Sequence, residues 1–377
     1  MLQNLSVDEV MLRALALAQG LKPTASNISR VAATVGPEAA RWAFTQTELR
    51  ERARDRFAKA DSMLFDRDGL EMSSHERVAT YHASLFPPGV LVADLTVGIG
   101  ADLIALAKRG PSIGFEVDQT RALLATHNLK VHEAEAPVRV ADSLSEDWPF
   151  LYALADPARR SGGRKRLDPA DYQPNLETLV ERMSKLRLGV IKLSPMMPDE
   201  ALRELGGAVQ FVSFGGECRE SLVVLGSEVQ IDNPVAVHIE SRSTLSASSE
   251  GFSAPLPRSW FYEADPAAIR VGGLGTLCKE HSLDLLGDSN GYLTGDESVD
   301  SPWLRRYEVL YCGTGDIAAT KRELRDRNCA TPDVKTRGKG LNSEALRKQW
   351  RLNGSEHVQV AVYRVGPKIK HAILRRS

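Results

Sequence analysis

The chain has 377 residues, of which 42% are hydrophobic and 26% are charged, and its formal net charge is −1. These proportions are typical of a folded protein with room for two or three domains, and they exclude a disordered or fibrous chain. No run approaches the roughly 18 apolar residues of a membrane span, and the N-terminus lacks the pattern of a signal peptide. We therefore expect a cytoplasmic protein that does not enter a membrane.

The charge is distributed unevenly along the chain. Residues 301–377 contain 17 Lys and Arg against 7 Asp and Glu, so the remainder of the chain is acidic. A basic C-terminal part beside an acidic body is typical of a protein with a polyanionic partner, although a solvated charged surface would look the same. Neither the four cysteines nor the eight histidines have the spacing of a metal site, and we expect no metal.

The pattern of apolar residues predicts three parts. Residues 1–85 are predicted to be helical, with helices to about residue 19 and over 27–35, 37–63 and 74–85. Strands alternate with helices over residues 86–230, which predicts a parallel α/β sheet. The seven strands are expected at 90–94, 112–117, 138–141, 151–156, 189–193, 209–214 and 220–226. Because the last two lie close together, we expect a doubly wound sheet closed by an antiparallel hairpin.

Residues 231–377 are predicted to form a small, basic α+β module. Its predicted strands cover 235–240, 334–336, 358–364 and 368–374, and its predicted helices cover 266–280, 317–327 and 343–353. The stretch 241–258 is rich in Ser and Pro and is expected to be a loop.

A glycine-containing turn follows the first strand, in the sequence LVADLTVGIGADLIALA from Leu91 to Ala107. Gly98 and Gly100 can turn sharply under a ligand that touches bare backbone. The second strand ends at Glu116, which can accept hydrogen bonds from both hydroxyls of a ribose. This strand, turn, helix and second strand together indicate a site for a nucleoside-bearing cofactor, although the two glycines could instead serve packing alone.

Two residues distinguish between the cofactors. Position 103, where a dinucleotide-binding fingerprint has its third glycine, is Leu103. Asp94 puts a negative charge beside the turn, which repels a pyrophosphate and attracts a sulfonium or an amino group. No phosphate-binding loop of the G-x-x-x-x-G-K-[ST] type occurs. The charge arrangement therefore predicts S-adenosyl-L-methionine as the cofactor, and the hairpin is typical of a methyltransferase sheet.

Two further acids follow predicted strands. Asp142 can accept from the adenine amino group of the cofactor, or it can simply cap the following turn. Asp156 and Pro157 close the fourth strand, where ligands bind in a doubly wound sheet. Asp156 can orient an amino group or take a proton as a substrate atom attacks the methyl group, and Pro157 makes the turn rigid. A sulfonium methyl group is already activated, so catalysis needs mainly positioning.

Basic residues border the same cleft. Arg159 and Arg160 begin a basic run that continues with Arg164 and surrounds two glycines, which suits a phosphate backbone but also a solvated loop. Lys192 ends the fifth strand, where it can pair with a carboxylate or a phosphate, or extend its ammonium to solvent.

With these residues, the chain resembles class I S-adenosylmethionine-dependent methyltransferases, and within them the bacterial group with a THUMP-like C-terminal domain. The matching motifs are DLTVGIGAD (94–102), FEVD (115–118), AD (141–142), DPARR (156–160), KLSP (192–195), ADPAAIR (264–270), YLT (292–294), KTRGKG (335–340) and LRKQWRLNG (346–354). The resemblance covers nearly the whole chain. The first motif is common to many enzymes, whereas DPARR followed by TRG is more specific to the group.

The resemblance implies a seven-stranded Rossmann-like sheet and cofactor contacts at Asp94, Gly98, Gly100, Glu116 and Asp142. It also implies a structured RNA substrate, such as tRNA or rRNA, because THUMP-related domains are associated with RNA-modifying enzymes. One departure concerns the acceptor atom. Enzymes that methylate exocyclic amines usually have Asp/Asn-Pro-Pro and an aromatic residue, where this chain has Ala158 and Arg159. A small-molecule or protein substrate, or an RNA-binding protein without catalysis, remain the alternatives.

Overall fold

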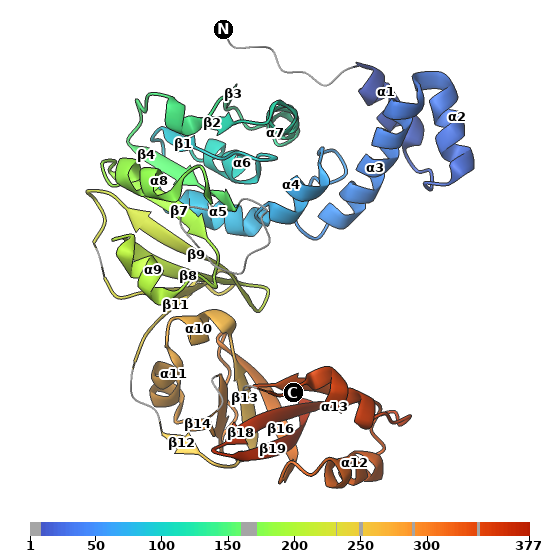
Figure 1. The fold of residues 1–377 in the computed structure, drawn as a ribbon, viewed down its shortest axis with the longest axis vertical. Helices are drawn as coiled ribbons and strands as arrows, with labels where there is room; N and C mark the ends of the chain where they lie inside the picture. The colour runs from blue at the N-terminus through green and yellow to red at the C-terminus, as the bar shows by residue number, and fades with distance from the viewer. Residues whose placement is uncertain (1–8, 160–171, 231, 249–251, 289–290, 338–339) are drawn as a thin grey trace. The chain divides into compact units, whose positions relative to one another are not determined.

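The structure is a computed structural model that describes residues 9–159, 172–230, 232–248, 252–288, 291–337 and 340–377 (Figure 1). By their internal contacts the residues form two compact units. The first comprises Met1–Ala208 and Leu222–Ile231, and the second comprises Val209–Ser221 and Asp232–Ser377. The three domains predicted from the sequence, 1–85, 86–230 and 231–377, stay predictions.

Helices precede the sheet, as the sequence predicts. They are α1 (Glu9–Ala18), α2 (Ala25–Val35), α3 (Pro37–Ala53), α4 (Arg67–Met72) and α5 (Glu76–Ser84). Helices α1 to α3, which lie at the blue end of the chain in Figure 1, pack around a small apolar core of their own. The predicted helix over 37–63 ends ten residues early, at Ala53, and the chain then runs through turns to α4.

The large sheet contains the seven predicted strands and two more. They are β1 (Val92–Asp94), β2 (Ser112–Glu116), β3 (Val138–Val140), β4 (Tyr152–Ala155), β7 (Leu188–Leu193), β8 (Ala208–Phe214), β9 (Glu217–Leu225), β10 (Val235–His238) and β11 (Ser243–Ser246). Their order is β3-β2-β1-β4-β7-β9-β8-β10-β11. The pairs β1–β2, β2–β3, β1–β4 and β4–β7 are all parallel, so the carboxyl ends of these strands share one edge.

Helices connect the parallel strands, as in a doubly wound sheet. These helices are α6 (Ala101–Ala107), α7 (Gln119–Val131), α8 (Leu176–Met183) and α9 (Asp199–Glu204). Beyond β4 the chain forms a separate two-stranded sheet of β5 (Ala158–Arg159) and β6 (Tyr172–Gln173). The predicted hairpin is present, because β8 and β9 are neighbours joined only by Gly215 and Gly216, which have φ of +66° and +75°. A two-residue turn with positive φ at both positions makes the two strands antiparallel.

Strands β10 and β11 correct two expectations from the sequence. The strand predicted at 235–240 pairs in parallel with β8 and so extends the large sheet. Residues 243–246, expected to lie in a loop, form β11 against β10. The backbone groups on the free edge of β8 explain the extension, since an unpaired edge is a template for a further strand.

A second sheet has the order β12-β14-β15-β13-β16-β19-β18-β17. Its strands are β12 (Ser253–Ala254), β13 (Trp260–Ala264), β14 (Asp284–Leu286), β15 (Tyr292–Gly295), β16 (Leu304–Gly313), β17 (Asp333–Thr336), β18 (Gln359–Val365) and β19 (Lys368–Arg376). Its helices are α10 (Pro266–Arg270), α11 (Leu274–His281), α12 (Ile317–Asp326) and α13 (Ser343–Gln349). The α+β character of this part is as predicted.

Five strands of this part were not predicted: β12, β13, β14, β15 and β16, the last of which pairs with both β13 and β19. The helix expected over 266–280 is two helices, because Gly272 has a φ of +76° and interrupts the helical backbone. Among the described residues, no helix is long and apolar enough to cross a membrane.

Two buried amides join the segment before α4 to the glycine turn. Asn128 on α7 is completely buried; it accepts from the amide of Leu64 and donates to the carbonyls of Leu64 and Ile99, at 2.8–2.9 Å. Gln46 on α3 makes the same paired contact with the backbone of Phe65, at 2.7 and 2.9 Å. The N-terminal helices are thereby held against the turn that contains Gly98 and Gly100.

Replacing Asn128 with Leu should destabilise the first unit by several kcal/mol, because each backbone group left unpaired costs roughly 1–3 kcal/mol. Urea denaturation followed by circular dichroism measures the loss. The matched control is Thr126→Ala on the same helix, whose hydroxyl bonds to the carbonyl of Ala122 four residues earlier. Equal unfolding midpoints for the two variants would contradict the role given to Asn128.

Candidate cofactor and substrate site

The glycine turn lies directly beyond β1 and leads into α6. Gly98 and Gly100 have φ of +57° and +93°, which glycine adopts at little cost. A Cβ added to Gly100 would lie 3.2 Å from the backbone of Ala125, so glycine is also needed there for close packing. A Cβ added to Gly98 would meet no atom within 4 Å. The space over Gly98 is therefore open to a ligand.

Glu116 lies at the end of β2 and faces the same turn. One carboxylate oxygen accepts from the amide of Gly98 at 2.8 Å, and the other accepts from the amide of Asp118 at 2.9 Å. The side chain is thus fixed in orientation by two backbone donors. A carboxylate has about four acceptor positions, so Glu116 can still accept hydrogen bonds from two hydroxyl groups.

Asp94 ends β1 and is only 2% exposed. Its Oδ1 accepts from the amide of Thr96 at 3.1 Å, whereas its Oδ2 is buried and has no hydrogen-bond partner among the described residues. Burial, reinforced by the negative charge of Asp102, raises the pKa of Asp94 to about 8. A buried carboxyl with one unpartnered oxygen and a raised pKa is suited to a cationic ligand, which would stabilise its ionised form.

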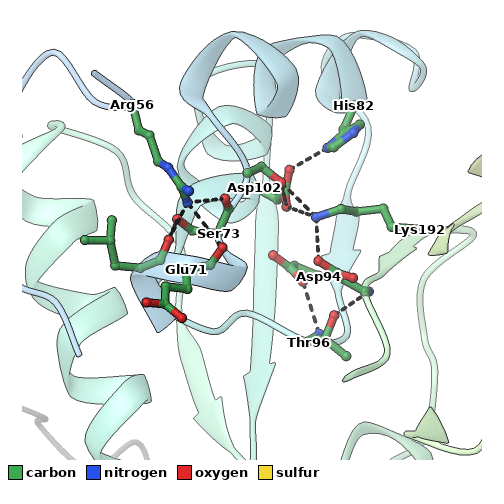
Figure 2. A network of polar contacts seen from close by, with 11 residues as sticks. Arg56, Glu71, Ser73, His82, Asp94, Thr96, Asp102 and Lys192 are labelled. Carbon is green, nitrogen blue, oxygen red and sulfur yellow. Dashed lines mark hydrogen bonds and ion pairs between the residues drawn. The ribbon is translucent and has the colours of Figure 1, made fainter. Parts of the chain in front are cut away.

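Lys192, at the end of β7, is the centre of a buried polar network (Figure 2). Its ammonium donates to Asp102 Oδ2 at 2.9 Å and to Ser74 Oγ at 2.8 Å, and it lies 2.7 Å from Asp156 Oδ2. Only 5% of its side chain is exposed. From the sequence, Lys192 is expected to face the cleft and to pair with a carboxylate or a phosphate, or to extend to solvent. In the structure its partners are two carboxylates and a hydroxyl of the chain itself.

Asp102 occupies the first turn of α6 and holds the other end of this network. Its Oδ1 lies 2.7 Å from Nδ1 of His82, whose side chain is completely buried on α5. Ser74 donates to Asp102 Oδ2 at 3.0 Å. Burial alone would raise the pKa of Asp102, but the charges and hydrogen bonds of Lys192 and His82 outweigh it and hold the pKa below its ordinary value.

Asp156 follows β4, and 42% of its side chain is exposed. Its amide donates to Thr96 Oγ1 at 2.6 Å, so Thr96 connects the turn after β4 to the turn after β1. The buried Pro157 follows. The structure thus brings Asp156 to the same edge of the sheet as Asp94, with one carboxylate oxygen held by Lys192 and much of the group accessible.

The structure says less about the remaining predicted site residues, which are Asp142 and the arginines after Pro157. Asp142 is exposed, and its carboxylate accepts from the amide of Leu144 at 2.9 Å, which is a local capping contact. The backbone of Arg159 lies in β5. The side chain of Arg159, and the whole of Arg160 and Arg164, lie outside the residues that the structure describes.

Two residues of the network, His82 and Asp102, were not singled out from the sequence. Asp102 lies within the DLTVGIGAD motif, but its position on the inner face of α6 carries no signal of its own. Arg56 supports the segment that delivers Ser74, because its guanidinium donates to the carbonyls of Glu71 and Ser73, both at 3.3 Å (Figure 2). Contacts between segments so far apart in sequence have no local pattern.

Comparison with known proteins agrees with this fold. Residues 304–376 match a family model described as THUMP domain-like. Two curated relatives from strains of Mycobacterium tuberculosis, each described as an uncharacterized S-adenosylmethionine-dependent methyltransferase, are 29% identical over 339 residues, which cover 86% of this chain and 93% of theirs. A crystal structure of a "putative methyltransferase" from Porphyromonas gingivalis W83 has a TM-score of 0.76 at 21% identity, and covers 99% of this chain and 100% of that one.

The predicted resemblance to S-adenosylmethionine-dependent methyltransferases with a THUMP-like C-terminal domain is therefore confirmed, and so is the predicted fold class. The names of both relatives include the cofactor that the charge at the glycine turn predicts. No group of three or more His, Cys, Asp or Glu side chains suited to a metal ion occurs in the part of the chain that the structure describes.

The raised pKa of Asp94 predicts how stability depends on pH. Without a ligand, the folded chain holds a proton on Asp94 up to about pH 8, whereas an unfolded chain loses it near pH 4. The folded state binds more protons in this window, so its free energy of unfolding should fall as pH rises from 5 to 8, by on the order of 1 kcal/mol per pH unit.

Asp94→Asn should remove this part of the pH dependence. The measurement is the difference in urea unfolding free energy between wild type and variant at pH 5, 6, 7 and 8, with Asp118→Asn as the control for a nearby exposed acid. Parallel pH profiles for wild type and Asp94→Asn would be inconsistent with a buried, protonated Asp94.

Proposed function

We propose that this chain is an S-adenosylmethionine-dependent methyltransferase that modifies a base in structured RNA, such as tRNA or rRNA. The observation that carries the cofactor assignment is the buried, unpaired Oδ2 of Asp94 beside the open space over Gly98. A pyrophosphate would bring more negative charge to this carboxyl, whereas a sulfonium or an ammonium group would satisfy it. Glu116, fixed by two backbone amides, would accept the ribose hydroxyls.

S-adenosylmethionine supplies a methyl group already activated on sulfur, so the chain has mainly to position the acceptor. Asp156 is suited to this task because Lys192 holds one of its oxygens while much of the carboxylate stays accessible. It would accept a hydrogen bond from an amino group of the substrate and orient the nitrogen lone pair toward the methyl group. A carboxylate next to an ammonium group favours its ionised form, which makes it a good acceptor and a weak base.

The RNA part of the proposal is supported by charge and by the THUMP-like match. On the second sheet, three cations surround one carboxylate: Glu263, which is 9% exposed, lies 2.7 Å from Lys335, 3.5 Å from Arg337 and 3.8 Å from Arg305. This cluster carries excess positive charge, and all three cations belong to the basic part of the chain. Excess cations of this kind are suited to phosphate groups.

Asp156→Ala should abolish methyl transfer while changing cofactor affinity by no more than a few-fold, because Asp156 acts on the substrate side. Transfer is measured with radiolabelled S-adenosylmethionine and RNA from a strain that lacks the gene, and affinity by calorimetry. Asp147→Ala, an exposed acid of the same unit, is the matched control. Transfer at the wild-type rate by Asp156→Ala would rule out this role.

The substrate class is tested with a cell extract from the deletion strain as methyl acceptor. RNase treatment should remove the radiolabelled product, and mass spectrometry of nucleosides should find one methylated base missing in the deletion strain. Label that survives RNase unchanged would favour a protein or small-molecule substrate. Failure to bind S-adenosylhomocysteine at millimolar concentration would instead favour an RNA-binding protein without catalysis.

A further inference from the structure

One ammonium group lies among three buried or half-buried carboxylates at the edge of the first sheet. Lys192 contacts Asp102 and Asp156, at 2.9 and 2.7 Å. Asp94 is close enough for both Lys192 and Asp102 to influence its ionisation, yet its Oδ2 has no hydrogen-bond partner among the described residues. The lysine therefore satisfies two acids of the cluster and leaves the third unsatisfied.

The contacts around Asp102 explain why Lys192 pairs with Asp102 and not with Asp94. Lys192 has three N–H groups, and the chain provides three acceptors for them: Asp102 Oδ2, Asp156 Oδ2 and Ser74 Oγ. Ser74 also donates to Asp102, so lysine, serine and carboxylate form a closed triangle. His82 binds the opposite oxygen of Asp102 at 2.7 Å and fixes the carboxylate in its orientation. Asp102 and Ser74 together hold the ammonium group on the α6 side.

If Asp102 were neutral, an ion pair between Lys192 and Asp94 would be strongly favoured. A buried ammonium group requires an anionic partner, and a buried carboxylate without a partner is equally costly. Asp94 would then lose its proton and pair with Lys192. In such an ion pair Lys192, and not a cationic ligand over Gly98, would stabilise the ionised form of Asp94.

We propose that Asp102, held by His82 and Ser74, retains Lys192 and thereby keeps Asp94 available for the positive charge of the cofactor. Asp102 is a positioning residue in this scheme, because it acts on the cofactor only through Lys192 and Asp94. The inference rests on the proposed function, since it assumes a cofactor with a cationic group at the glycine turn. Through this chain of contacts, Asp102 on α6 would act on the cofactor without contacting it.

The test is calorimetric binding of S-adenosylmethionine to the full chain, which needs no methyl acceptor. Asp102→Asn keeps the shape of the side chain but removes its charge, so Lys192 should turn to Asp94. The affinity should fall about 10- to 100-fold, as expected when a charged hydrogen-bonding partner is lost.

The decisive variant is the double substitution Asp102→Asn with Lys192→Gln. It removes the displaced cation, so the affinity should return to within about threefold of that of Lys192→Gln alone. A general loss of packing at Asp102 would not be repaired by a second substitution in the same network. His127→Leu serves as the matched control, because His127 bonds to the carbonyl of Ser62 outside the network.

Several outcomes would overturn the inference. Wild-type affinity in Asp102→Asn would show that Asp102 does not keep Lys192 from Asp94, and an equally weak double variant would show that the freed lysine is not the cause. If Asp102→Asn does not fold, as judged by circular dichroism, Asp102→Ser, which also removes the charge, gives the same comparison with and without Lys192→Gln. If wild-type protein itself fails to bind S-adenosylmethionine, the proposed function fails, and this inference fails with it.

Discussion

The ion pairs of Lys192 are the interactions on which the rest of the candidate site depends. A lysine that is 5% exposed is retained in a fold only when acceptors surround its ammonium group, and here they come from β4, from α6 and from the segment before α5. The network therefore joins three separate parts of the first unit at the edge where the parallel strands end. Its removal would disturb the position of Asp156, the orientation of Asp102 and the charge around Asp94 together.

The N-terminal helices belong to this site in a physical sense, because His82 on α5 contacts Asp102 directly and Leu49 and Leu70 share an apolar core with Ile99 of the glycine turn. Asn128 and Gln46 hydrogen-bond to the backbone of Leu64 and Phe65, and Arg56 hydrogen-bonds to the backbone just after α4. These bonds position Ser74, the next residue, beside Lys192. The helical region is thus a support that determines where the ammonium group lies.

The second unit has a different character. Its core contains large aromatic side chains, among them Phe261, Tyr292 and Tyr363, and its excess of basic residues is confined to residues 301–377, which contain 17 Lys and Arg against 7 Asp and Glu. Glu263 is the only acid within salt-bridge distance of three cations among the described residues, and it organises Arg305, Lys335 and Arg337 into a single cluster. In the proposed function this unit holds the substrate, whereas the first unit holds the cofactor and the reacting groups.

The sequence by itself determined the features that depend on local backbone chemistry. Gly98 and Gly100 predicted a turn with positive φ, the acids after successive strands predicted a polar edge, and the paired strands around Gly215 predicted the hairpin. Each of these signals lies within a few residues of the structure that it specifies. The tertiary structure alone decided which acids share the buried Lys192, that His82 and Ser74 complete the network, and that β10 and β11 extend the sheet. The contacts of the network join residues that lie 20 to 118 positions apart, and they depend on the free energy of burying charge, which no local pattern records.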